Sequence, residues 1–220
     1  MENNTLCNRH SLGVNNHTKM YVTYTRIYGW SDYGGESSYQ PGYRLENMMW
    51  MTLLVYDYII PGERKMRLAV VGSINTDMTV TAERIPLKGE TLMGSSLSYI
   101  PGGKGANQAV AMAKLGAEVE MFGCVGDDSN GEKMLENLKA VGVGTEHIQI
   151  LKGVPTGIAM ITVGDNDNTI IVVPGANGKV DRAYIDSIKS ELEKFDMVVL
   201  QHEIPLETVH YVIEFCYEKG

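Results

Sequence analysis

From residue 66 onwards, short apolar runs alternate with longer segments in which apolar residues recur every three or four positions. The apolar runs, at 67–72, 119–125 and 197–200, predict buried strands. The longer segments, at 105–115, 128–141 and 181–192 and beyond Pro205, predict amphipathic helices. This alternation is typical of an α/β fold, in which helices flank a mostly parallel sheet with right-handed crossovers.

Two segments interrupt the alternation. Residues 158–163 and 169–173 have strand patterns, and the polar stretch 164–168 between them predicts a hairpin. Residues 78–98 include Thr79, Val80 and Thr81, which predict another strand. We expect these pieces to form a small second sheet beside the main one.

Residues 1–65 differ from the rest of the chain in composition. They hold eight of the 12 tyrosines and both tryptophans, and they show no sustained strand or helix period. One interpretation is an aromatic arm that binds a sugar or a partner. The other is a disordered or spurious extension upstream of a start at Met66, where the first strand pattern begins. We expect the second, so that the predicted domain covers 66–220.

The net charge excludes some classes of partner. Residues 1–65 hold six of the 19 basic and six of the 27 acidic residues, so the whole charge of −8 belongs to 66–220. Nucleic acids and anionic membranes require a basic surface, and we expect neither as a partner. No apolar run reaches 18 residues, and we expect no secretory signal in the first 20. Three widely spaced cysteines predict no disulfide framework, which favours the cytoplasm.

The densest chemical motif is the stretch Pro-Gly-Gly-Lys-Gly-Ala-Asn-Gln-Ala at 101–109, which leads into a predicted helix. Glycines allow a ligand to approach the backbone, and the free N–H groups at the start of a helix attract electron-rich groups. Two common phosphate-binding loops are excluded. Lys104 is followed by glycine rather than serine or threonine, and Gly105 is followed three residues later by Gln108 rather than glycine.

This stretch and four others, in the same order, resemble motifs of the ribokinase-like (PfkB) carbohydrate kinases. The first motif is Gly-Gly-Lys-Gly-Ala-Asn-Gln-Ala at 102–109, followed by Gly116 and Gly126. The others are Gly-Ser-Ile-Asn-Thr-Asp at 72–77, Lys-Gly-Glu-Thr at 88–91, Gly-Asp-Asp at 126–128 and Val-Leu-Gln-His-Glu-Ile-Pro at 199–205. The resemblance covers 66–220. It is greatest to the ribokinase type, because the lysine of the first motif and the Asn-x-Asp pair occur together.

The ends of the predicted strands and the resemblance indicate the same candidate site. Asn75 and Asp77 follow one strand and Glu203 follows another, and open α/β sheets bind ligands at the carboxyl ends of their strands. An amide and a carboxylate two residues apart can form directional hydrogen bonds with neighbouring hydroxyls of a polyol. The resemblance implies a sugar-binding set of Asn75, Thr76, Asp77, Gly103, Lys104, Gly105, Ala106, Asn107 and Glu203. The structural alternatives are a turn residue at Asp77, an exposed loop carboxylate at Glu203 and a surface charge at Lys104.

Other polar residues have simpler interpretations. His147 and His202 have no neighbouring cluster of cysteine, histidine or aspartate in the sequence, and we expect neither to be catalytic. Asp127 and Asp128 precede a predicted helix, and no further ligand follows at metal spacing. They predict a turn and a helix N-cap rather than a metal site.

The resemblance implies a kinase that transfers the γ-phosphoryl group of ATP to the 5-hydroxyl of D-ribose. It also implies Mg²⁺, a monovalent cation such as K⁺, and a homodimer formed through a β lid to which the 158–173 hairpin is similar. In the family, the catalytic aspartate of a Gly-Ala-Gly-Asp motif and the nucleotide pocket belong to the carboxyl-terminal half. The sequence contains no Gly-Ala-Gly-Asp motif, so we expect the sugar-binding half of a kinase without its catalytic half.

Three alternatives stay open at this point. The substrate of a related kinase could be deoxyribose, fructose or a nucleoside. The chain could instead be a non-catalytic sugar-binding or dimerising module. A nicotinamide-dependent oxidoreductase is the least favoured, because the dinucleotide motif is absent.

Overall fold

The structure is a computed structural model that describes residues 66–219. The predictions for residues 1–65 lie outside the described residues. Among residues 66–219, no helix has the length and apolar character needed to cross a membrane.

The main sheet has four parallel strands in the order β5-β4-β1-β8. Strands β1 (Arg67–Val71), β4 (Glu118–Gly126) and β8 (Met197–Leu200) confirm the three predicted buried strands. The edge strand β5 (Ile148–Leu151) was not predicted. It is short and its middle residues are exposed, so it lacks the continuous apolar run that marks a central parallel strand.

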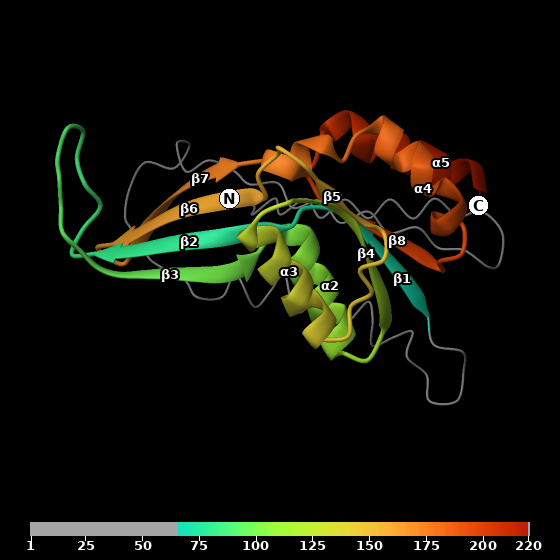
Figure 1. The fold of residues 1–220 in the computed structure, drawn as a ribbon, viewed down its shortest axis with the longest axis horizontal. Helices are drawn as coiled ribbons and strands as arrows, with labels where there is room; N and C mark the ends of the chain where they lie inside the picture. Colours follow the sequence, from blue (N-terminus) through green and yellow to red (C-terminus); the bar gives the residue numbers. More distant parts are fainter. Residues whose placement is uncertain (1–65, 220) are drawn as a thin grey trace, which may run out of the picture.

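Helices cover both faces of this sheet, as Figure 1 shows. One face carries α2 (Lys104–Lys114) and α3 (Ser129–Ala140), and the other carries α4 (Arg182–Leu192) and α5 (Leu206–Lys219). Successive side chains of a strand point to opposite faces. Leu68 and Val70 of β1 therefore pack with α2 and α3, while Ala69 and Val71 pack with α4 and α5. The predicted α/β fold with a helix-flanked parallel sheet is confirmed.

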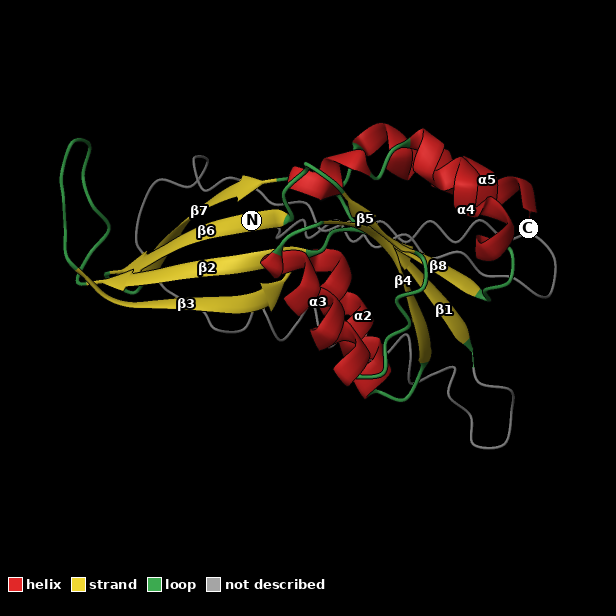
Figure 2. Ribbon diagram, viewed as in Figure 1, coloured by secondary structure: helices red, strands yellow, loops and turns green. Residues whose placement is uncertain are grey.

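A second sheet of order β3-β2-β6-β7 extends away from the helices (Figure 2). Its strands are β2 (Asn75–Ala82), β3 (Gly94–Gly102), β6 (Gly157–Gly164) and β7 (Asp167–Val173). The 158–173 hairpin is confirmed, with a turn tighter than expected, because Asp165 and Asn166 alone form its tip at positive φ. Strand β3 runs to Gly102, so the glycine-rich motif begins in a strand rather than in a loop.

One cluster of hydrogen bonds ties the two sheets together. Asp128 is the N-cap of α3, as predicted, and accepts a hydrogen bond of 2.8 Å from the Gly131 amide. Its carboxylate also accepts from the amide and the hydroxyl of Thr156, at 2.8 and 2.7 Å. The Thr156 hydroxyl in turn accepts from the Gly126 amide at 2.9 Å. The end of β4, the start of α3 and the approach to β6 are thereby fixed relative to one another.

We predict that Asp128→Ala lowers the free energy of unfolding at pH 7 by about 1–2 kcal/mol, because a helix cap is lost and the buried Thr156 loses partners. Burial alone would raise the pKa of Asp128, but the hydrogen bonds from Thr156 and Gly131 outweigh it and lower the pKa below the ordinary 3.8. The charged form is therefore the stabilising one. Its contribution is complete well above pH 3.8 and is lost as the pH falls through the lowered pKa.

Urea unfolding at several pH values measures this effect against Asp128→Asn, which keeps the cap and removes the charge. The advantage of the native chain over Asp128→Asn should shrink on acidification. The neighbouring exposed residue gives a control, Asp127→Asn, which should leave the unfolding curve unchanged. An advantage of the native chain that is constant between neutral and strongly acidic pH would contradict the prediction.

Candidate functional site

Three segments that are far apart in the sequence meet at the carboxyl ends of β1 and β8. They are the turn 72–75 after β1, the start of α2 at 103–107 and the loop 201–203 after β8. The structure therefore brings Asn75, Lys104 and Glu203 of the predicted set to one edge of the main sheet. This edge is where the second sheet begins, because β2 starts at Asn75.

The start of α2 lies directly against the turn after β1. A Cβ atom on Gly105 would lie 2.7 Å from the Ser73 amide nitrogen, and one on Gly103 would lie 2.7 Å from the Ser73 carbonyl oxygen. Gly103 also has a φ of 92°, which disfavours any residue with a side chain. Glycine at 103 and 105 is therefore needed for this packing.

The first N–H groups of α2 already have partners, so the expectation that they are free is wrong. The Lys104 amide donates to Glu203 Oε2 at 3.0 Å, and the Gly105 amide donates to Ser73 Oγ at 3.2 Å. The Ala106 amide donates to the Ser73 carbonyl at 2.9 Å. The tight approach permitted by the glycines brings these protein groups to the amides of Lys104, Gly105 and Ala106.

Glu203 is the central charge of the site. Its Oε2 accepts from the Ser73 hydroxyl at 2.8 Å as well as from the Lys104 amide, and its Oε1 lies 3.2 Å from Lys104 Nζ. Burial alone would raise the pKa of Glu203, but the amide and ammonium of Lys104 and the Ser73 hydroxyl lower it overall. Glu203 is thus a charged, half-buried carboxylate that caps α2 and holds Lys104, rather than an exposed loop residue.

Asn75, Thr76 and Asp77 are the first three residues of β2. Asp77 therefore lies in a strand and not in a turn. Strand alternation puts Asn75 and Asp77 on one face and Thr76 on the other. Asn75 pairs with Gly102 in the register, and the carboxylate of Asp77 lies so close to Gly102 that a Cβ atom there would overlap it. Because Gly102 has no side chain, the carboxylate of Asp77 can lie against its backbone.

Two buried residues outside the predicted set form hydrogen bonds beside this network. Gln201 is fully buried, and its Nε2 donates to Gln108 Oε1 of α2 at 2.6 Å. Asn177, in the short 3₁₀ helix η2 (Gly175–Lys179), donates to Asn75 Oδ1 at 2.6 Å. The signal that could have indicated Asn177 is the Gly-Ala-Asn sequence at 175–177, directly after a predicted strand and identical to 105–107.

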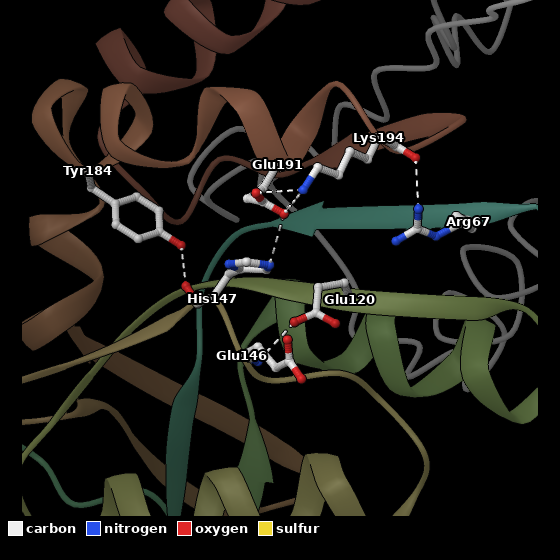
Figure 3. A network of polar contacts seen from close by, with 7 residues as sticks. All are labelled: Arg67, Glu120, Glu146, His147, Tyr184, Glu191 and Lys194. Atoms are coloured by element: carbon white, nitrogen blue, oxygen red, sulfur yellow. Dashed lines mark hydrogen bonds and ion pairs between the residues drawn. The ribbon is translucent and has the colours of Figure 1, made fainter.

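His147 belongs to a different network, shown in Figure 3. Its ring stacks on Phe122 with 4.8 Å between ring centroids, and its Nε2 lies 3.8 Å from a carboxylate oxygen of Glu191. Its carbonyl accepts a hydrogen bond of 2.8 Å from the Tyr184 hydroxyl. These contacts join the start of β5 to α4, and none of the residues in the figure belongs to the candidate site.

We predict that Gly105→Ala destabilises the fold by about 1–3 kcal/mol, because the added methyl group would press on the backbone of Ser73 and Gly72. The better helix propensity of alanine offsets at most about 1 kcal/mol of this. The matched control is Gly178→Ala, where the nearest atom to the new methyl group is 3.9 Å away. Urea unfolding of both variants tests the prediction, which fails if the two changes have equal effects.

Comparison with known proteins agrees with this architecture. Residues 65–220 match the family described as pfkB family carbohydrate kinase. A ribokinase from Bacillus subtilis is 47% identical over 150 residues, which are 68% of this chain and 51% of that protein. A deoxyribokinase from Salmonella typhimurium is 38% identical over 156 residues, which are 70% of this chain and 51% of that protein.

A solved structure of Arabidopsis thaliana ribokinase, complexed with ribose and ATP, has a TM-score of 0.65 at 34% sequence identity. The match covers 71% of this chain and 52% of that one. The chain thus spans about half the length of the curated relatives it matches. A match that includes more than half of this sequence, together with the α/β fold, shows that the chain belongs to the pfkB family of carbohydrate kinases.

Proposed function

We propose that this chain provides the sugar-binding half of a kinase that phosphorylates the 5-hydroxyl of D-ribose with ATP. The observation that carries the proposal is the meeting of Asn75, Lys104 and Glu203 at the carboxyl ends of β1 and β8. Support also comes from the similarity to ribokinases, one of which was solved with ribose and ATP. The second candidate substrate is deoxyribose, because a deoxyribokinase is among the relatives.

In the proposed reaction, these residues bind and orient the sugar. The 5-hydroxyl oxygen forms a bond to the γ-phosphorus as the bond from that phosphorus to the bridging oxygen of ADP breaks, and the hydroxyl proton passes to the catalytic aspartate that the family has in its carboxyl-terminal half. Catalysis of phosphoryl transfer consists mostly of positioning and charge stabilisation. Asn75 and Lys104 would donate hydrogen bonds to other hydroxyls, and Asp77 and Glu203 would accept hydrogen bonds from them, so that the ring is fixed and the 5-hydroxyl stays in line with the phosphate. Of the other proposed residues, Gly103, Gly105 and Ala106 are buried in the packing of α2, Asn107 is exposed on α2, and Thr76 lies on the opposite face of β2 from Asn75 and Asp77.

ATP, Mg²⁺ and K⁺ are included in the proposal only because the chain belongs to a family of kinases. Among residues 66–219, no group of three or more aspartate, glutamate, histidine or cysteine side chains is arranged to hold a metal ion. We therefore assign neither cation to a described residue and derive no step through them. A cytoplasmic location is proposed from the three separate cysteines in the sequence.

A homodimer through the second sheet is also proposed. Several large side chains on one face of its strands are exposed within the described structure, including Leu97, Tyr99, Met160 and Ile171 at 52–66%. Exposed apolar area of this kind marks an interaction surface. A second copy of the same sheet offers the complementary surface. Light scattering that gives the mass of two chains is expected, and a monomer over a wide concentration range would refute the dimer.

The activity can be tested by joining residue 220 to the carboxyl-terminal half of the Bacillus subtilis ribokinase. We expect ATP turnover that depends on ribose and exceeds the turnover with deoxyribose, fructose and nucleosides. Each half assayed alone is the control and should be inactive. A folded fusion that binds ATP but shows no sugar-dependent turnover would contradict the proposed function, and a preference for deoxyribose would favour the second candidate.

In the same fusion, Asp77→Ala should raise the ribose Kd about 10- to 1000-fold, because hydrogen bonds to a charged group are worth about 1.5–3 kcal/mol each. Asp77→Asn keeps one acceptor and should lie between Asp77→Ala and the native chain. The ATP KM should hardly change. Asp167→Ala, at an exposed position of the same sheet, is the matched control. A lower melting temperature with an unchanged ribose Kd would show that Asp77 is structural only.

A further inference from the structure

The side chain of Asn177 is buried where the two sheets meet, and it forms three hydrogen bonds. It is 1% exposed. Its Oδ1 accepts from the Ile74 amide at 2.8 Å, and its Nδ2 donates to the Ile74 carbonyl at 3.2 Å and to Asn75 Oδ1 at 2.6 Å. Asn177 therefore contacts both the backbone before Asn75 and the Asn75 side chain itself.

The backbone of Ile74 decides which way the Asn177 amide faces. A peptide N–H can only donate and a peptide carbonyl can only accept. Asn177 must therefore direct its oxygen to the Ile74 amide and its NH₂ group to the Ile74 carbonyl. The opposite orientation would set two donors against each other and two acceptors against each other. The orientation of this side-chain amide is therefore fixed by its two backbone partners, because the donor and acceptor roles of a peptide group cannot be exchanged.

The orientation of Asn177 decides that of Asn75 in turn. The second N–H of Asn177 faces Asn75 and needs an acceptor, so Asn75 must direct its Oδ1 towards it. The Asn75 NH₂ group then faces the other way. Gly157 pairs with Asn75 in the register, and a Cβ atom at Gly157 would overlap both amides. The close fit holds the two amides in place, and the donor and acceptor roles of Ile74 decide which way each one faces.

We propose that Asn177 is a positioning residue that makes Asn75 a hydrogen-bond donor, and not an acceptor, towards the sugar. This rests on the proposed function. A sugar hydroxyl that accepts from Asn75 keeps its own proton to donate. Asp77 lies two residues further along the same face of β2, and its carboxylate can accept the hydrogen bond that the hydroxyl donates. The pair would thus recognise hydroxyl groups by both of their hydrogen-bonding functions.

Asn177→Asp tests the proposal with a side chain of the same shape. One carboxylate oxygen can still accept from the Ile74 amide, but the other now faces Asn75 Oδ1 and the Ile74 carbonyl. Asn75 should turn its NH₂ group towards the new carboxylate and its oxygen towards the sugar. We expect the ribose Kd of the 220-residue chain to rise about 10- to 100-fold. Asn168→Asp makes the same chemical change at an exposed position and should leave the Kd unchanged.

A double-mutant cycle separates this role from a general loss of stability. If Asn177 acts through Asn75, then Asn177→Asp should weaken ribose binding no more than about two-fold in a chain that already carries Asn75→Ala. Both variants should lower the melting temperature, so the melting temperature alone does not distinguish a positioning role from a general loss of stability. An undiminished further loss of binding in the Asn75→Ala background would overturn the proposal.

Hydrogen exchange of the side-chain amides, followed by nitrogen-15 NMR on the native chain, gives a result that needs neither ribose nor a variant. The NH₂ protons of Asn177 should exchange with solvent more slowly than those of Asn75. The reverse order would overturn the assigned orientation. If the native chain and the fusion both fail to bind ribose, the proposed function is wrong, while the exchange order still decides how the Asn75–Asn177 pair is oriented.

Discussion

The close packing of one backbone segment on another is the constraint on which the rest of the site depends. The start of α2 lies against the turn after β1, at distances that leave no room for side chains at 103 and 105. Because α2 begins there, Lys104 reaches Glu203, and the second sheet begins beside both. Glycine at 103 and 105 is thus required by the protein's own packing.

This packing buries polar groups, and a buried polar group must have a partner to avoid a large cost. Ser73 and Glu203 satisfy each other and the first N–H groups of α2, while Asn177 satisfies the backbone of Ile74 and the side chain of Asn75. The side chains that would meet a ligand are held in place before it arrives. Such preorganisation reduces the ordering cost of binding, and the same network joins the two sheets.

The elements that could be predicted from the sequence are those with a clear local pattern of apolar residues. Strands β1, β4 and β8 are apolar on both faces, and the helices have clear apolar stripes, so their periods are visible. Strand β5 and most of β3 are exposed and carry no such pattern. Asn75 and Glu203 could be predicted because each follows a strand. The Gly-Ala-Asn sequence at 175–177 marks Asn177, but its bond to Asn75 could not be predicted, because that bond joins residues 102 positions apart and depends on the return of the chain along β7.

The charges of the site favour a neutral polyol over an ionic ligand. Glu203 is ionised and Asp77 adds a second carboxylate to the proposed set, so an anion would meet two like charges. Lys104 and the donor groups of Asn75 would in turn oppose a simple cation. Three of the roughly four acceptor positions of Glu203 are occupied by Ser73 and Lys104, which leaves about one for a ligand. A set of fixed donors and acceptors of this kind is matched by hydroxyl groups, because each hydroxyl both donates and accepts.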